Sequence, residues 1–226
     1  MTHFKRTDLN RIRRVPDRGA YDRETVYRIL DDALICHVGI VQDGRPVVIP
    51  MIHARAGDTL LLHGATSSRL QRILQSGAPV CVTVAHLDGI VLARSIYHHS
   101  LNYRSAVIFG TGTLVAEERE KWAAMERFAE KLAPGRWNDA RQPSSAEYKA
   151  TAIVSVAIES ASAKIRTGPP GDEEDDYALP VWAGVLPIAQ QLGPLQPDPR
   201  LDAAVAVPQY LRDYTARRTA NSETTG

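Results

Sequence analysis

Hydrophobic and polar positions change their spacing along the chain, and each change predicts a new structural element. Leu30 and Leu34 follow Tyr27 at spacings of three and four residues, so their side chains share one face of a helix. Asp22 stands where it can cap the N-terminus of that helix. Further along, the apolar residues form short runs separated by turn residues, as strands do. Such strand-like runs cover 36–41, 47–54, 59–63, 80–85, 90–95, 105–115 and 152–158.

Turn residues between these runs predict tight reversals of the chain. Asp43-Gly44 is typical of a hairpin turn, and Gly57-Asp58 and Asp88-Gly89 are expected to form two more turns. Helical spacing returns at 69–74 and 117–132, with a short helix expected from Ser144. Short strands with a few helices favour a mainly β fold, a small antiparallel, Greek-key-like β-barrel with α-helical covers, over a doubly wound parallel sheet.

The strand at 47–54 is apolar on both faces in its first half. An antiparallel strand normally exposes one face to water, so a partner subunit or a bound aromatic ring is expected to cover the outer face. Pro50 interrupts this run and has no N–H, which predicts an edge, a bulge or an opening of the ladder.

The ends of the chain differ in composition from the middle. Residues 1–20 form a basic arm, expected to lie solvated over the domain or over a partner subunit. A nucleic-acid-binding arm is the alternative, although no aromatic residues alternate with the charges. Residues 21–166 hold the periodic elements and form the main domain. Residues 167–226 are rich in proline and contain an acidic run at 172–176, which is expected to be a solvated loop. We expect this last part to be an extended arm around the core, disordered at Ser222–Gly226.

Composition excludes several classes of function. The net charge is +1, so no large field indicates nucleic acid or an acidic membrane surface. No apolar run is long enough to span a bilayer, and the polar N-terminus lacks the apolar stretch of a signal peptide. Cys36 and Cys81 are expected to be buried free thiols, although a disulfide is the alternative. We therefore expect a cytoplasmic protein.

One segment has the composition of a phosphate site. A strand ends near His63, the small residue Gly64 follows, and Ser67, Ser68 and Arg69 stand at the start of the next helix. Hydroxyls, first-turn N–H groups and a guanidinium fork can together hold a phosphate. The alternative is a serine-capped helix with a surface arginine.

A second segment, residues 93–105, concentrates arginine, histidine, tyrosine and serine between two strands, which suits a planar heterocycle with polar edges. His98 and His99 within it are candidates for proton donation or for positioning a small acid, or they are loop histidines bonded to backbone.

Other chemistries find little support. No carboxylate or thiolate stands at ligand spacing beside His53 or His63, so we expect no metal centre, although haem binding through one histidine stays open. Gly110-Thr111-Gly112 starts like a dinucleotide fingerprint, but the third glycine is missing and the strand continues. Hydrolase and phosphotransferase motifs are absent from the sequence.

Together these segments resemble the FMN-binding split-barrel superfamily of pyridoxamine 5'-phosphate oxidases, and most closely its nitroimidazole-reductase-like branch. The resemblance extends from Tyr21-Asp22-Arg23 through 47–69 and 94–110 to Gly168-Pro169-Pro170 and Trp182-Ala183-Gly184-Val185. It implies a homodimer with FMN at the interface. Where the oxidases have two basic residues after the serine, this chain has Ser68-Arg69, and it lacks a match to their C-terminal substrate-phosphate residues. Both departures argue against pyridoxamine-phosphate oxidation.

The resemblance also implies roles for individual residues. Ile49, Pro50, Met51 and Ile52 match the strand along the flavin ring, and His63, Gly64, Ser67, Ser68 and Arg69 match the loop that holds phosphate and ribityl chain. Asn102, Tyr103, Arg104 and Ser105 are candidates for the contribution of the second subunit.

Three functions are compatible with these features. The first is an FMN-dependent oxidoreductase that reduces a small oxidised substrate, such as a nitro compound or a quinone. The second is a flavin carrier or sensor without turnover, and the third is a deazaflavin or haem binder on the same barrel.

Overall fold

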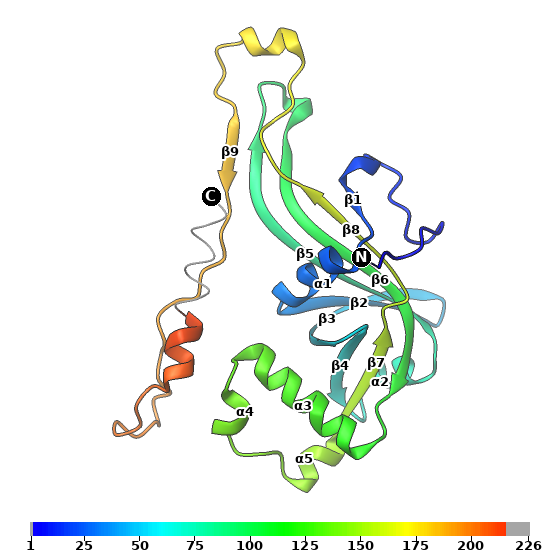
Figure 1. Cartoon of the computed structure of the whole chain (residues 1–226), viewed down its shortest axis with the longest axis vertical. Helices are drawn as coiled ribbons and strands as arrows, with labels where there is room; N and C mark the ends of the chain where they lie inside the picture. Colours follow the sequence, from blue (N-terminus) through cyan, green and yellow to red (C-terminus); the bar gives the residue numbers. More distant parts are fainter. Residues whose placement is uncertain (1, 216–226) are drawn as a thin grey trace.

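Six antiparallel strands close into a small barrel in the computed structural model, which describes residues 2–215 (Figure 1). The ring closes because β6 pairs with both β5 and β7. This arrangement confirms the predicted antiparallel barrel with helical covers. The six strands are β2 (Ile35–Gln42), β3 (Arg45–Ala56), β4 (Thr59–Ala65), β5 (Pro79–Leu92), β6 (Ser100–Leu114) and β7 (Thr151–Ala157).

The barrel interior is filled by the alternating apolar residues that the sequence pattern indicated. In β2, for example, Cys36, Val38 and Ile40 are buried while their neighbours face outward. Helix α1 (Arg23–Asp32) adds Val26, Ile29 and Leu30 to this core. The helix begins as predicted, because the Asp22 carboxylate accepts a hydrogen bond from the Thr25 N–H at 2.8 Å.

Helices also cover the lower end of the barrel. Helix α2 (Arg69–Gln75) inserts Leu70 and Leu74 into the main core. Helix α3 (Glu118–Leu132) begins at Glu117, whose carboxylate accepts from two backbone N–H groups, and packs Phe128 into a second apolar cluster with Leu61 and Ile153. Two short helices follow, α4 (Arg136–Asp139) and α5 (Ser145–Ala150).

Strands β5 and β6 extend beyond the barrel as a long hairpin (Figure 1). The turn predicted at Asp88-Gly89 is wrong, because β5 continues through it with a shift of register between Leu87 and Gly89. The chain instead reverses at η2 (Ile96–His98). A Cβ on Gly89 would lie 2.9 Å from Val185 Cγ1, so glycine here permits a close strand approach at a bulge.

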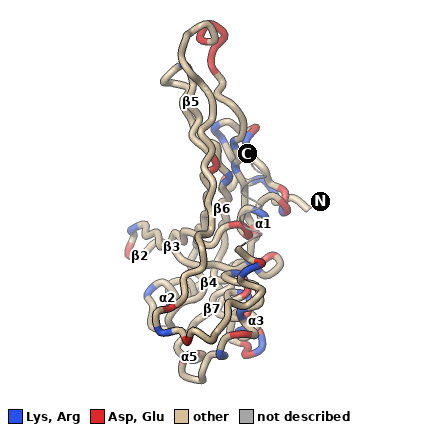
Figure 2. The backbone as a smooth tube through the Cα atoms, turned by 90° about the vertical axis from the view of Figure 1, so that its left-hand side faces the viewer, with Lys and Arg blue, Asp and Glu red and all other residues tan. Residues whose placement is uncertain are grey.

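The C-terminal part carries more structure than its composition indicated. Strand β8 (Ser160–Arg166), which the sequence pattern did not predict, ends the main domain and pairs with β6. Beyond it, β9 (Gly184–Pro187) pairs with the projecting part of β5. Between them, the acidic run and the short helix η3 (Glu174–Ala178) lie at the tip of the hairpin (Figure 2). Residues 209–215 are helical, within the part that was expected to be extended. The segment 222–226, predicted to be disordered, lies outside the described residues.

The basic N-terminal segment packs on the domain. Phe4 is buried in the main core, and its N–H donates to the Tyr21 carbonyl at 2.8 Å. The guanidinium of Arg23 lies 4.5 Å from the centre of the Phe4 ring. After η1 (Pro16–Arg18), the two-residue strand β1 (Gly19–Ala20) pairs with β8.

Candidate functional site

The barrel is split along one edge of β3. Residues 45–52 of β3 pair with β2, but β3 pairs with β4 only from His53 to Ala56. Within residues 2–215, no other strand joins the remaining edge of 45–52. An unpaired strand edge presents alternating N–H and C=O groups to whatever lies beside it. Pro50 stands in this stretch, in agreement with the predicted opening of the ladder.

The two faces of this stretch of β3 have different surroundings. Val47, Ile49 and Met51 pack against the main core, so the barrel covers the inner face. On the outer face Val48 is 63% exposed. Ile35 and Val41 of β2 are also exposed and extend the apolar surface. The structure thus places the predicted flavin-strand residues on alternate faces, with Pro50 on the same side as Val48.

The predicted phosphate loop connects β4 to α2. Ser68 occupies the N-cap position of α2, but its side chain makes no capping hydrogen bond. Within the described part of the chain, the hydroxyls of Ser67 and Ser68 have no hydrogen-bond partner, whereas the Thr66 N–H donates to the Ala150 carbonyl at 2.9 Å. The alternative interpretation is met in part: Ser68 stands at the N-cap of α2 and Arg69 is exposed, but the Ser68 hydroxyl makes no capping bond and stays available to a ligand.

Gly64 and Gln71 lie against each other beside this loop. A Cβ on Gly64 would lie 3.1 Å from two side-chain atoms of Gln71, so the glycine makes room for that side chain. Gln71 is 1% exposed, and neither amide atom has a hydrogen-bond partner within residues 2–215. A buried amide without a partner is costly, so Gln71 is a candidate ligand contact. Sequence patterns give no signal for Gln71 as a ligand contact, because it stands between helix positions that face the core.

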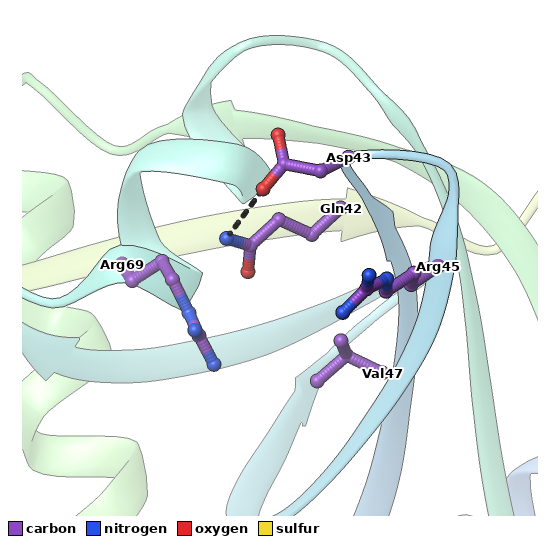
Figure 3. Close-up of a pocket in the computed structure, with 5 residues that line it drawn as sticks. All are labelled: Gln42, Asp43, Arg45, Val47 and Arg69. Carbon is purple, nitrogen blue, oxygen red and sulfur yellow. Dashed lines mark hydrogen bonds between the residues drawn. The ribbon is translucent and has the colours of Figure 1, made fainter.

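Two arginines line a pocket at the tip of the β2–β3 hairpin (Figure 3). The pocket has a volume of about 460 Å³ and is lined by Gln42, Asp43, Arg45, Val47 and Arg69. Arg45 from β3 and Arg69 from α2 both extend into it. Neither guanidinium pairs with a carboxylate in the described part of the chain. The sequence gives no sign that Arg45, Asp43 and Gln42 line a pocket, because Asp43-Gly44 has the composition of an ordinary hairpin turn.

The imidazole of His63 lies at the end of β4, half-buried. Its ring meets the Phe128 ring edge-on, with centroids 4.5 Å apart. Burial lowers the pKa of His63, so its imidazole is held in the neutral form. Among residues 2–215, no group of three His, Cys, Asp or Glu side chains could hold a metal ion.

Most side chains proposed for the second subunit's contribution are used within their own chain. The Asn102 amide accepts from Arg166 and donates to the Gly168 carbonyl at 3.1 Å. The Arg104 guanidinium contacts Asp88 and Asp32, and the hydrogen bonds that it donates to the Asp88 carboxylate raise the pKa of Arg104. The Ser105 hydroxyl donates to the Lys164 carbonyl at 3.1 Å. Tyr103 lies beside them on β6, half-buried.

His98 and His99 lie at the far tip of the β5–β6 hairpin, well away from α2 in the same chain (Figure 1). His98 Nε2 is 3.6 Å from a Glu173 carboxylate oxygen, and His99 Nδ1 is 3.0 Å from the Ser95 carbonyl oxygen. One chain therefore does not bring these histidines to the predicted phosphate loop.

Comparison with known proteins identifies relatives over most of the chain. A search of curated protein sequences found no match. Among solved structures, the flavocytochrome Anf3 from Azotobacter vinelandii is 40% identical, with 92% of this chain and 96% of that chain covered and a TM-score of 0.87. An FAD and heme binding protein from Mycobacterium smegmatis is 35% identical, with coverage of 88% and 97% and a TM-score of 0.84.

More distant matches show the fold alone. A proposed 5-nitroimidazole antibiotic resistance protein from Bacteroides thetaiotaomicron is 22% identical, with 65% of this chain and 86% of that chain covered and a TM-score of 0.56.

A family model described as pyridoxamine 5'-phosphate oxidase matches residues 22–165. None of the helices within residues 2–215 is long and apolar enough to cross a membrane. From its strand pairing, its split and these matches, the chain belongs to the pyridoxamine 5'-phosphate oxidase family of split-barrel proteins.

Proposed function

We propose that this protein binds a flavin in the split of its barrel and uses it to pass electrons to a small oxidised substrate. The flavocytochrome and the FAD and heme binding protein support this proposal, because each aligns with nearly nine-tenths of the chain or more. A flavin supplies the electron-transfer chemistry, and the protein supplies binding, orientation and exclusion of competing reactions. No side chain then has to act as a nucleophile.

The observation that carries the proposal is the open edge of β3 beside a loop, residues 67–69, whose serine hydroxyls have no hydrogen-bond partner within the described residues. A flavin ring carries donors and acceptors along its rim, and the edge of residues 49–52 offers backbone groups of both kinds. Ser67, Ser68 and Arg69 supply hydroxyls and a cation for a phosphate. The unpaired amide of Gln71 adds a buried polar group near the same loop. These residues fit the FMN half of a flavin.

We also propose that the protein acts as a homodimer. The exposed apolar side chains of Ile35, Val41 and Val48 on the outer face of β2 and β3 support this, because apolar surface gains free energy when a partner covers it. In such a dimer, Tyr103, His98 or His99 of one subunit would be able to contact the flavin bound by the other. Dilution to a monomer should then release the flavin, and flavin retained by a demonstrated monomer would contradict this arrangement.

Binding of a haem in addition is the second candidate. Both close relatives are named for a haem or cytochrome function, and His63 has a half-buried neutral imidazole, the form that ligates iron. A Soret band in the purified protein would support it. His63→Ala should remove that band, whereas His3→Ala, at an exposed position outside the proposed sites, should leave the Soret and flavin bands unchanged. Flavin bands without a Soret band would leave only the flavin proposal.

An absorption spectrum and one pair of variants test flavin binding directly. Oxidised flavin gives two bands in the near-ultraviolet and blue, and a deazaflavin is distinguished by its different spectrum. Arg69→Ala should weaken flavin binding by about 1.5–3 kcal/mol, the scale of a charged hydrogen bond. Arg72→Ala, on the same helix but outside the pocket, is the matched control. Unchanged affinity in Arg69→Ala would remove Arg69 from the site.

Turnover is tested separately from binding. Bleaching of the flavin bands by a nicotinamide donor, followed by reoxidation with a nitro compound or a quinone, is the result expected of an oxidoreductase. Flavin that binds tightly but is neither reduced nor reoxidised under these conditions would favour the carrier or sensor instead.

A further inference from the structure

The chain between β9 and the last described helix, residues 189–207, forms a tail segment that is exposed along its whole length. Within residues 2–215, its hydrogen bonds stay inside the segment, as from the Leu201 N–H to the Asp198 carbonyl at 2.9 Å. Figure 1 shows the segment running along one side of the molecule, apart from the barrel. Its side chains are therefore available to another molecule.

We propose that the tail segment of one subunit lies on the outer face of β2 and β3 of a second copy and there covers the flavin site. This inference rests on the proposed homodimer and flavin site. It goes beyond them because it names the segment that one subunit contributes and the surface that receives it, with Leu192 and Leu195 as the contacting side chains.

The tail segment is held at both ends by its own chain. Before it, β9 pairs with β5, and the Ile188 N–H donates to the Asp88 carbonyl at 3.1 Å. After it, the Tyr210 hydroxyl donates to the Asp139 carboxylate at 2.7 Å, and a Cβ on Gly135 would lie 3.0 Å from the Tyr210 ring. The segment is therefore a tethered loop with a fixed place on the molecule, and not a free end.

Large apolar side chains recur along the tail segment although water surrounds them. Single exposed apolar residues are ordinary on a protein surface, but a row of them on one exposed segment favours a state in which a partner covers them. Their burial would gain free energy in proportion to the apolar area removed from water. These exposed side chains are Leu192, Leu195, Leu201, Val205 and Val207.

The distribution of charge indicates which surface covers the segment. Its first half is neutral, because residues 188–197 contain no Asp, Glu, Lys or Arg. The outer face of β2 and β3, made of alternate residues from Ile35 to Val41 and from Pro46 to Pro50, contains none either. One chain thus carries two neutral, apolar surfaces that nothing within residues 2–215 covers. In a two-fold dimer each copy's segment can cover the other's face, so a second copy satisfies both surfaces at once.

The dimensions of the two surfaces agree. Proline-rich chain favours the polyproline II conformation, which has three residues per turn and rises about 3.1 Å per residue. Leu192 and Leu195 are three residues apart and so point to the same side of such a segment. Residues 189–197 would extend over about 28 Å, and the eight residues of β2 extend over about 26 Å.

The receiving face adjoins the proposed flavin site. Pro50 lies on this face and within the stretch 49–52 that is proposed to line the flavin. A tail segment across it would bring Leu192 and Leu195 to the wall of the partner's flavin site and keep water from that side. Exclusion of competing reactions is one of the tasks of a protein that uses a flavin.

A photoreactive residue in the segment tests where it lies. Full-length protein with p-benzoylphenylalanine in place of Leu195 is allowed to exchange subunits with isotope-labelled wild type and is then irradiated. The expected product joins a labelled chain to an unlabelled chain, and mass spectrometry should map the link to residues 35–41 or 46–50 of the labelled chain. Crosslinks within one chain only, or links between chains at other places only, would overturn the inference.

A charge in the segment tests its contribution to the dimer and to the flavin site. Leu192→Asp combined with Leu195→Asp should raise the dissociation constant of the dimer at least about tenfold in analytical ultracentrifugation, because the carboxylates would be buried against apolar surface. The same variant should lose flavin more readily on dilution than the wild type. Arg200→Ala, in the charged half of the segment, is the control and should change neither. Both leucines are exposed in one chain, and thermal unfolding verifies that the variant folds.

The outcomes separate this inference from the proposed function. Unchanged dimerisation and flavin retention in the leucine double variant would overturn the inference, while a wild-type dimer that holds flavin would leave the proposed function standing. A wild type that binds flavin as a monomer at every concentration would refute the proposed homodimer, and the inference with it.

Discussion

The carboxylate of Asp172 lies against the backbone of Arg94 and ties the C-terminal segment to the tip of the β5–β6 hairpin. It accepts hydrogen bonds from the Arg94 N–H at 2.9 Å and the Ser95 N–H at 3.2 Å, and the Arg94 guanidinium lies 3.2 Å away. Desolvation by itself would raise the pKa of Asp172, but these hydrogen bonds outweigh it and the pKa is lowered. Arg94 also covers the Tyr177 ring at 4.8 Å.

Loss of this carboxylate should loosen the tip. Asp172→Asn places an amide where two backbone N–H groups need an acceptor, so residues 94–99 and β9 should exchange their amide hydrogens faster than in the wild type. Acid should act in the same direction: because the pKa of Asp172 is lowered, its contribution is present above about pH 4 and is lost as the pH falls below that value. Asp175→Asn, in the same acidic run, is the control. Unchanged exchange in Asp172→Asn would contradict this role.

Arg166 should be required for the stability of the domain. Its guanidinium, 8% exposed as a residue, donates to the Asn102 amide oxygen, to the Gly168 carbonyl at 3.2 Å and to the Pro169 carbonyl at 3.1 Å. Arg166→Ala leaves several of these acceptors without a donor and should lower the free energy of unfolding by about 1–3 kcal/mol in urea denaturation. Arg200→Ala, in the exposed tail, should have no measurable effect. Equal stability of the two variants would show that Arg166 is dispensable.

His53 should make the protein less stable in mild acid. Burial, followed by the nearby charge of Lys131, lowers the pKa of His53 to about 4. Because an unfolded histidine has a pKa of about 6.5, the unfolded state binds the proton first, and stability falls by about 3 kcal/mol from pH 6.5 to pH 4. Denaturation of His53→Met at several pH values should show a smaller loss over this range. In His53→Met the Leu30 carbonyl loses its contact with His53 Nε2 but still accepts a hydrogen bond from the Lys131 ammonium, so this buried oxygen is not left without a donor. If the wild type and His53→Met lost equal stability between pH 6.5 and pH 4, His53 would not be the group responsible.

Gly112 should tolerate no larger residue. A Cβ at this position would lie 2.3 Å from the Leu74 carbonyl oxygen and 2.8 Å from Val154 Cγ1, so α2 or β7 would have to move. Gly112→Ala should destabilise the protein by about 1–3 kcal/mol or more, the usual cost of overpacking. Gly171→Ala adds a methyl group in open space and is the control. The experiment is thermal or urea unfolding, and a wild-type midpoint for Gly112→Ala would contradict the packing seen here.

Local patterns in the sequence determined most of the barrel. Apolar alternation in β2 and the helical spacing of Tyr27 and Leu30 follow from geometry that each residue shares with its near neighbours, so these elements could be predicted. The prediction was wrong for Leu34, because α1 ends at Asp32. The chemistry of Ser67, Ser68 and Arg69 was equally local. The missing third glycine sufficed to reject Gly110 and Gly112 as a nucleotide motif. The sequence could not show that the backbone of Ala157 and of Leu74 approaches β6 too closely for a side chain at these two positions.

Only the tertiary structure decided which groups meet. Asp88-Gly89 has the composition of a turn, and the approach of β9 from nearly a hundred residues away makes it a bulge instead. Arg45 and Arg69 line one pocket because β3 separates from β4 and leaves space beside α2, and no short-range pattern encodes that separation. Asn102 and Arg104, polar enough for a ligand, are held by Arg166 and Asp88 instead. Pairing between distant segments depends on the whole packed chain, which is why local spacing predicts the strands but not the site between them.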